Sequence, residues 1–168
     1  MASPENKNFA KIYDKHIDKI YRFIFLKTGT KEVAEDITSQ VFAKGWRKFK
    51  LQSHSIKNMS AYLFQIARAE VANYYREVSK FQIISAQSVE IIDEQPNPEA
   101  IQEAGLASKD AQNALKELED DLQNILIWHF VEGMSFKEIG SLLGRPEGTV
   151  RVMAHRALKE LREKMEKG

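Results

Sequence analysis

Apolar side chains recur at three- and four-residue steps along most of the chain, which is the pattern of amphipathic helices. The first stripe runs over residues 9–28 and stops at Gly29, where a left-handed backbone can end a helix. Thr30 can then cap the next helix, predicted over residues 31–50. A third stripe predicts a helix over residues 60–78.

The helical signal weakens over residues 81–109. Within them, residues 93–99 (DEQPNPE) are acidic and contain two prolines, which is typical of a linker. A new helical pattern runs over residues 110–130 and is broken by Gly133. No strand-like alternation of useful length and no internal repeat is found. The sequence therefore predicts an all-α chain.

Charge divides the chain in the same way. The net charge is +7 over residues 1–80, −8 over residues 81–121 and +2 over residues 122–168, although the whole chain carries only +1. Two basic blocks around an acidic one indicate two modules that meet a polyanion and a connector that does not. We therefore expect two small helical domains, residues 1–80 and 110–168, joined by a flexible acidic linker.

Composition excludes several classes of protein. The 168 residues are 43% apolar and contain no cysteine, so the chain is neither wholly disordered nor built on disulfides or Cys-bound zinc. No apolar run is long enough for a membrane span, and charged residues interrupt the N-terminal stretch where a signal peptide needs an apolar core. We expect a cytoplasmic protein.

No enzymatic site is apparent. The histidines, His16, His54, His129 and His155, are scattered and lack further ligands at metal-binding spacing. Glycine-rich stretches lack the preceding strand that a phosphate-binding loop requires. We therefore predict no catalytic residue, no metal and no cofactor.

The most informative stretch is residues 135–166. Ser135 and Glu138 form a capping-box pattern that opens a short helix, and Gly144 follows where a tight turn needs a positive φ. Pro146 suits the start of the next, longer helix. That helix has an apolar stripe predicted to face inward, formed by Val150, Ala154, Ala157, Leu158, Leu161 and Met165. The stretch thus has the helix-turn-helix arrangement, which consists of a short helix, a glycine turn and a longer helix with a basic outer face.

This stretch resembles region 4 of the extracytoplasmic-function sigma factors of bacterial RNA polymerase. The residues that carry the resemblance are Glu138-Ile139, Gly148-Thr149-Val150-Arg151, Arg156-Ala157 and Leu161-Arg162. The N-terminal module resembles region 2 of the same family through Ala34-Glu35-Asp36-Ile37, Phe42, Tyr62-Leu63, Ile66-Ala67-Arg68 and Arg76. The two resemblances occur in the expected order.

The chain departs from the family pattern at several positions. Ser39-Gln40 stands where Gln-Glu is usual, Ala69 replaces an Asn, Glu119 replaces a Pro and Gln123 an Arg. Gly140 stands in place of Ala, Val152-Met153 in place of Ser-Arg, and Leu158 in place of Arg. The changes in the second helix of the hairpin affect the promoter sequence that is recognised more than they affect the fold.

The resemblance implies a transcription initiation factor that binds core RNA polymerase, recognises the −35 and −10 promoter elements and promotes melting. It assigns polymerase binding to Asp36, Gln40 and Phe42. The candidates for the −10 element are Ser53, His54, Lys57, Asn58, Arg68, Asn73, Tyr75, Arg76 and Lys80, in the predicted loop 51–58 and the helix after it. The candidates for the −35 element are Arg145, Glu147, Thr149, Arg151, Val152, His155, Arg156 and Lys159.

Residue chemistry agrees with these assignments, because aromatic and cationic side chains suit single-stranded DNA and a basic helix suits a major groove. Most members of the family are held by an anti-sigma factor, so a partner of that kind is also implied. Two alternatives remain open: a helix-turn-helix regulator that acts without polymerase, and an adaptor whose two modules bind only proteins.

Overall fold

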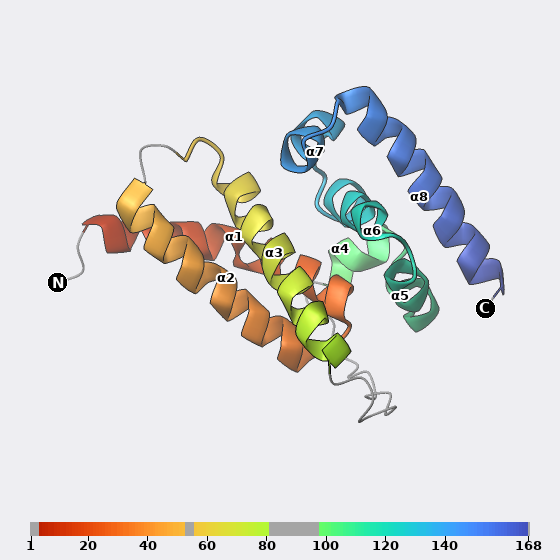
Figure 1. Cartoon of the computed structure of the whole chain (residues 1–168), viewed down its shortest axis with the longest axis horizontal. Helices are drawn as coiled ribbons and strands as arrows, with labels where there is room; N and C mark the ends of the chain where they lie inside the picture. Colours follow the sequence, from red (N-terminus) through yellow and green to blue (C-terminus); the bar gives the residue numbers. More distant parts are fainter. Residues whose placement is uncertain (1–3, 53–55, 81–97, 168) are drawn as a thin grey trace. The chain divides into compact units, whose positions relative to one another are not determined.

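A computed structural model describes residues 4–52, 56–80 and 98–167 of the chain, and every element in these ranges is a helix (Figure 1). The predicted all-α fold class is confirmed. The chain divides into two compact units, Met1–Glu94 and Gln95–Gly168.

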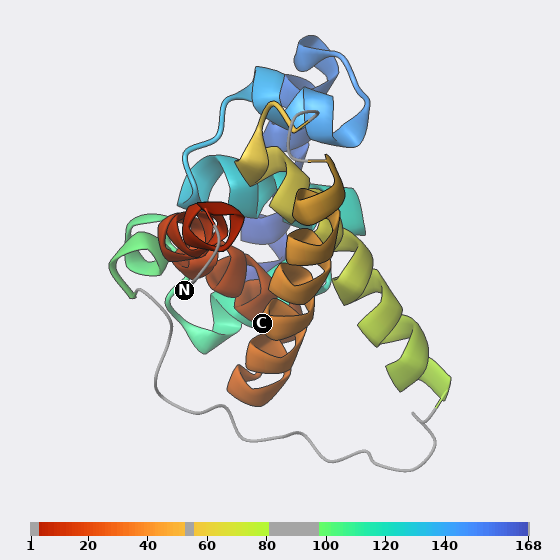
Figure 2. The same ribbon diagram turned by 90° about the vertical axis from the view of Figure 1, so that its left-hand side faces the viewer.

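The first unit is a bundle of three long helices, α1 (Pro4–Thr28), α2 (Lys31–Gln52) and α3 (Met59–Lys80). Each helix contacts the other two, and α2 and α3 lie side by side in both views (Figures 1 and 2). Its core is built from large apolar side chains that are fully buried: Ile20, Phe23, Ile24, Leu63 and Phe64. The bundle fixes which sides of α2 and α3 remain exposed.

The helix ends in this unit follow the sequence with one exception. Gly29 has a φ of 83° and its N–H donates to the Phe25 carbonyl at 2.7 Å, which ends α1. Asn58 caps α3 through its side-chain oxygen, which accepts from the Ala61 N–H at 3.1 Å. The predicted Thr30 cap is wrong, because the buried Thr30 hydroxyl has no hydrogen-bond partner among the described residues.

The second unit contains shorter helices arranged around one long one. In chain order they are α4 (Pro98–Glu103), α5 (Lys109–Lys116), α6 (Asp120–Leu126), the π-helix η2 (Ile127–Val131), α7 (Phe136–Leu143) and α8 (Glu147–Lys167). Helix α8 packs against α5, α6 and α7. Figure 1 shows α7 near one end of α8 and α5 near the other. Trp128 lies in η2 and is fully buried.

Residues 98–109, which the sequence analysis placed in the linker, contain an ordered helix. Ile101 of α4 is fully buried, and α4 packs on η2. Leu106 is also buried, and its carbonyl accepts a hydrogen bond from the Gln112 side chain at 2.9 Å. These contacts place the segment in the second unit. Residues 81–97 of the predicted linker lie outside the described residues.

The helix predicted over residues 110–130 is interrupted. Backbone N–H groups of Glu117 and Leu118 turn back to carbonyls three residues earlier, and Glu119 takes an extended backbone. The Gln123 side chain donates to the carbonyls of Lys116 and Leu118 at 3.0 and 2.7 Å. These side-chain bonds satisfy carbonyls that a continuous helix would have paired, so the break costs little.

His16 makes the first unit sensitive to acid. It is only 5% exposed on α1, and burial, together with Lys19 and Lys15, lowers its pKa from 6.5 to about 4. The unfolded chain therefore binds a proton as pH falls below 6.5, whereas the folded unit does not.

The contribution of His16 to the free energy of unfolding of the first unit should consequently be fully present above pH 6.5. It should be lost between pH 6.5 and about 4, by up to about 3 kcal/mol. Urea unfolding at several pH values checks this in a Trp128→Phe background, where Trp46 reports on the first unit. His16→Gln should remove this part of the acid sensitivity. An equal decline in the variant would contradict the assignment.

Candidate nucleic-acid and polymerase interfaces

The helix-turn-helix geometry is present as predicted. The Ser135 hydroxyl accepts from the Glu138 N–H at 3.1 Å, and the Glu138 carboxylate accepts from the Ser135 N–H at 3.3 Å, which completes the capping box of α7. Gly144 ends α7 with a φ of 67°. Pro146 directly precedes α8, which begins at Glu147.

Gly140 brings the turn close to α7. The Arg145 N–H donates to the Gly140 carbonyl at 2.9 Å. A Cβ added to Gly140 would lie 2.5 Å from the Arg145 carbonyl oxygen, closer than any ordinary contact. The departure from the usual Ala therefore has a physical reason: only glycine allows the backbone between the two helices to approach this closely.

The rotation of α8 follows its apolar stripe. Val150, Ala154, Ala157 and Leu161 are buried, as predicted. Leu158 is half-buried, and Met165 is exposed, so the prediction that Met165 faces inward is wrong. The stripe turns outward at the last turn of the helix, where less of the unit remains to cover it.

All the −35 candidates lie on the exposed side of the turn and of α8. They are Arg145, Glu147, Thr149, Arg151, Val152, His155, Arg156 and Lys159. The structure thus brings these residues together on α8 and the turn before it. Val152 is 68% exposed although it is apolar.

The arginines of this surface have carboxylate partners. Arg151 lies 3.3 Å from Glu147, and Arg145 lies 3.5 Å from Asp121. Arg156 contacts two carboxylates, those of Glu119 and Glu160. The described residues contain no carboxylate that pairs with Lys159.

Arg151 also contacts an aromatic ring that the sequence did not indicate. Its guanidinium carbon lies 5.6 Å from the centre of the Phe136 ring. Phe136 stacks in turn on His129, with ring centres 4.1 Å apart, and the His129 Nδ1 lies 2.7 Å from the Met134 carbonyl. A cation held over a ring has a restricted orientation. No sequence spacing relates residues 129, 136 and 151, so only the fold reveals this stack.

The polymerase candidates separate into two places. Asp36 and Gln40 are exposed on α2 and line a groove of about 290 Å³ between α2 and α3. Phe42 is only 5% exposed and packs on Phe9 and Tyr13 of α1. The Phe42 ring thus belongs to the α1–α2 packing and lines a pocket between these helices, and its assignment to a polymerase contact stays a prediction.

The −10 candidates do not form one surface. Asn73 lines the same groove as Asp36 and Gln40, and Arg76 and Lys80 follow on the same side of α3. Tyr75 lies on another side, where its hydroxyl donates to the Lys27 carbonyl of α1.

The remaining −10 candidates are placed as follows. Arg68 is half-buried and shares the side of α3 that carries Tyr75. Lys57 is exposed, and Asn58 is exposed but uses its side chain to cap α3. Ser53 and His54 lie outside the described residues.

The groove between α2 and α3 is bridged by an ion pair. The Lys44 ammonium contacts the Glu70 carboxylate, and the Glu70 side chain is only 8% exposed. A buried carboxylate needs such a partner. Glu70 lies two residues after Ile66-Ala67-Arg68, which carry the family resemblance, but it is not itself one of them. Its ion pair with Lys44 explains how a charged residue is accommodated on the buried side of α3.

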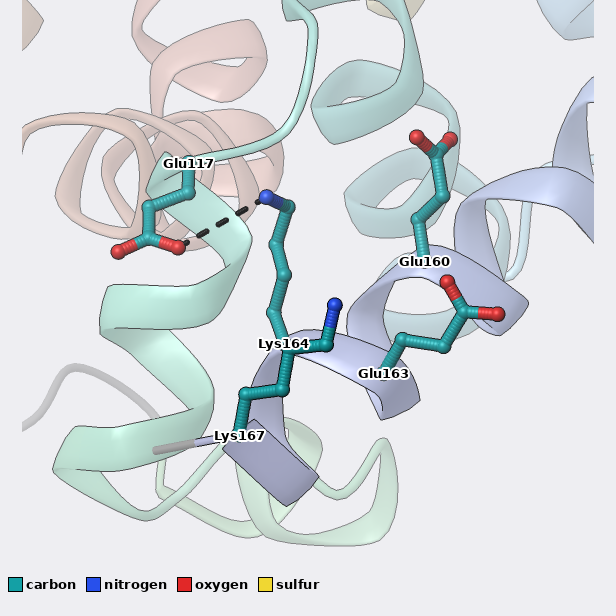
Figure 3. A pocket seen from close by; sticks show the side chains of 5 residues that line it. All are labelled: Glu117, Glu160, Glu163, Lys164 and Lys167. Atoms are coloured by element: carbon teal, nitrogen blue, oxygen red, sulfur yellow. Dashed lines mark ion pairs between the residues drawn. The ribbon is translucent and has the colours of Figure 1, made fainter.

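A pocket lined by charged side chains lies near the C-terminal end of α8. It measures about 330 Å³ and is lined by Glu117, Glu160, Glu163, Lys164 and Lys167. Figure 3 shows the Lys164 ammonium pointing toward Glu117, at 3.8 Å. This contact joins the end of α5 to α8. No group of His, Asp and Glu side chains in the described ranges is arranged to hold a metal ion. Nor does any described helix have the length and apolarity of a membrane span.

Comparisons with known proteins identify the family. Residues 12–81 match the family model for sigma-70 region 2, and residues 108–161 match that for sigma-70 region 4. The two matches together cover most of the chain and correspond to its two units. The chain belongs to the sigma-70 family.

Relatives place it within that family. It is 28% identical to the ECF RNA polymerase sigma factor BldN of Streptomyces coelicolor, over 91% of this chain and 58% of BldN. It is 28% identical to the ECF RNA polymerase sigma factor SigW of Bacillus subtilis, over 94% of this chain and 88% of SigW. The chain is therefore a member of the extracytoplasmic-function group. It spans about three fifths of the length of some relatives, BldN among them.

Solved structures show the same fold. The sigma factor RpoE of Bartonella quintana, solved with the anti-sigma factor NepR, matches with a TM-score of 0.74 at 24% identity, over 95% of this chain and 98% of that chain. CnrH, solved with the cytosolic domain of CnrY, matches with a TM-score of 0.67 at 17% identity, over 95% and 88%.

The contact at Gly140 gives a prediction with a matched control. Gly140→Ala should destabilise the second unit by roughly 1–3 kcal/mol, because the new Cβ overlaps a backbone carbonyl. Gly148→Ala, in the first turn of α8, meets no atom within 4 Å and should stabilise the unit by about 0.5–1 kcal/mol. Urea unfolding followed by Trp128 in a Trp46→Phe background measures both. Equal effects of the two substitutions would show that the close approach is not a constraint.

Proposed function

We propose that this chain is a promoter-recognition subunit of bacterial RNA polymerase. It binds the core enzyme through the first unit, reads the −35 element through α8 and contributes to opening the −10 element. The observation that carries the proposal is the exposed basic side of α8, presented by a helix-turn-helix in a region 4 unit that follows a region 2 unit. The catalysis of RNA synthesis belongs to the polymerase, and the chain acts in the cytoplasm where the polymerase is.

In the second unit, α8 enters the major groove with its N-terminal turns first. Arg151, held by Glu147 and the Phe136 ring, is the residue we assign to a base edge. Arg156 and Lys159, one to two turns further on, are assigned to phosphates. Base contacts specify the sequence, whereas phosphate contacts fix the register of the protein on DNA.

In the first unit, the groove between α2 and α3 is the surface we assign to the polymerase. Its polar lining comes from Asp36 and Gln40 on α2 and from Glu70, Asn73 and Glu77 on α3. Glu70 pairs with Lys44 and Glu77 with Lys80, so Asp36 and Gln40 are the polar side chains of the groove that we assign to a contact with the polymerase. Asn73 lies in this groove, so we assign it to the polymerase side rather than to DNA.

Single-stranded −10 DNA is then assigned to the opposite side of α3 and to its start. Tyr75 is 42% exposed, and its hydroxyl bond to the α1 backbone holds the ring in place. A ring fixed in this way can stack on an unpaired base at little cost in entropy. Arg68 on the same side supplies a cation for the backbone.

An inhibitory protein partner is part of the proposal. RpoE and CnrH were each solved with a bound protein, NepR and CnrY, respectively. We extend a partner of the anti-sigma kind to this chain, because masking either interface would prevent promoter recognition. A region 2 unit disfavours the alternative of a regulator that acts without polymerase.

The polymerase surface can be tested with a matched pair of variants. Asp36→Ala with Gln40→Ala should weaken binding to core polymerase about tenfold, because two polar contacts are lost. Glu35→Ala with Ser39→Ala removes one carboxylate and one neutral polar side chain, each one residue earlier on α2 and outside the groove, and should leave affinity unchanged. Fluorescence anisotropy with labelled chain measures both, and circular dichroism checks the fold. Equal loss in both double variants would contradict the assignment.

The DNA surface can be tested by comparing two cations of α8 in the reconstituted holoenzyme. Arg151→Ala should cost roughly 1–3 kcal/mol and relax the preference at one or two base pairs of the −35 element. Lys159→Ala should weaken all promoters about equally and reduce the salt slope by about one. Promoter selection from a randomised library at two salt concentrations distinguishes them. If Arg151→Ala lowered every sequence equally, its contact would be to the backbone.

A further inference from the structure

The three arginines among the −35 candidates, Arg145, Arg151 and Arg156, each pair with a carboxylate of the same unit. Arg151 pairs with Glu147 of its own helix, and the Arg156 Nε lies 3.1 Å from Glu160, also on α8. The other two partners come from a different element, the start of α6.

Those two partners are Glu119 and Asp121. The Glu119 carboxylate lies 3.9 Å from Arg156, and the Asp121 carboxylate lies 3.5 Å from Arg145. Both contacts therefore cross from α6 to the recognition hairpin. Three arginines face four carboxylates, so their combined formal charge is −1 rather than +3.

Glu119 is not required for the helix that it precedes. It occupies the N-cap position of α6, but its side chain makes no capping hydrogen bond and extends to Arg156 instead. A proline is usual at this position in the sequence pattern that the chain resembles, so the carboxylate is a departure from that pattern. Removing its charge leaves the capping of α6 as it is.

Asp121 is held more firmly than Glu119. Its side chain is 18% exposed, against 65% for Glu119, and it lies in the first turn of α6. A carboxylate with little freedom cannot swing away when DNA approaches Arg145. A phosphate that binds this guanidinium therefore comes within a few ångströms of a fixed negative charge.

We propose that Glu119 and Asp121 lower the affinity of the α8 surface for DNA by competing with phosphates for Arg156 and Arg145. The inference rests on the proposed function and adds two residues that set the affinity of the α8 surface for DNA. An arginine that exchanges a carboxylate for a phosphate neutralises less of the DNA charge than an unpaired cation does. The salt slope is then smaller than the cations of this surface alone would produce.

The consequence concerns how the second unit reaches its site. Weak DNA binding by α8 alone makes recognition depend on tethering through the first unit and the polymerase, which raises the effective concentration of α8 at the promoter. A free chain then does not remain on non-promoter DNA.

The test uses the full-length chain and a fluorescein-labelled duplex of mixed sequence, about 30 base pairs long, titrated by anisotropy between about 50 and 300 mM salt. The variants are Glu119→Gln and Asp121→Asn, separately and together. Glu103→Gln is the control, since it removes one exposed negative charge at the end of α4, away from the hairpin. Lys159→Ala shows whether the measured binding uses α8.

Each neutralised carboxylate should tighten binding about three- to fivefold at the lowest salt and by less than about twofold at the highest. The salt slope should become steeper by up to about one for each variant. A damaged fold does not account for tighter binding, so this direction of change supports the proposal.

The other outcomes overturn it. If Lys159→Ala weakens binding while Glu119→Gln and Asp121→Asn leave it unchanged or weaken it, the carboxylates do not compete and the proposed function stands. If Glu103→Gln tightens DNA binding as much as Glu119→Gln and Asp121→Asn do, the affinity depends on the net charge of the chain and not on these two carboxylates. If no variant binds DNA and the wild-type holoenzyme also fails to select a promoter, the proposed function fails with the inference.

Discussion

The approach of the Arg145 carbonyl to Gly140 is the constraint on which the DNA-facing part of the structure depends. It sets how close α8 starts to α7, and Gly144 sets the direction in which the chain leaves. Once the start is fixed, the buried stripe of α8 determines its rotation. The exposure of Arg151, His155 and the other candidates is therefore a consequence of backbone packing, not of their own contacts.

Charge has two different roles in the two units. In the first, Lys44 neutralises the buried Glu70, so that α2 and α3 can pack while a groove lined by polar and apolar side chains stays open beside them. In the second, carboxylates pair with arginines at the surface, where each pair contributes little to stability. Their main effect there is on the field that an approaching polyanion meets. The same kind of contact is thus structural in one unit, whereas in the other its proposed role is in DNA binding.

Local features were predictable from the sequence because they depend on a few neighbouring residues. The capping box at Ser135, the turn at Gly144 and the apolar stripe of α8 follow from spacing alone. Features that need distant residues were not predictable. The stack of His129, Phe136 and Arg151 is one, and the break before α6, stabilised by the Gln123 side chain, is another.

The acidic block of the sequence, residues 81–121, gains a second meaning from the structure. Its pattern suggested a connector that avoids the polyanion, yet its last residues form the start of α6 and contact the recognition hairpin. Net charge counted along the chain groups those carboxylates with the acidic connector, whereas the fold places them beside the arginines of the proposed DNA surface. A basic block of the sequence is therefore not the same as a basic surface. The strength of the surface field depends on which carboxylates the fold brings within a few ångströms of each arginine.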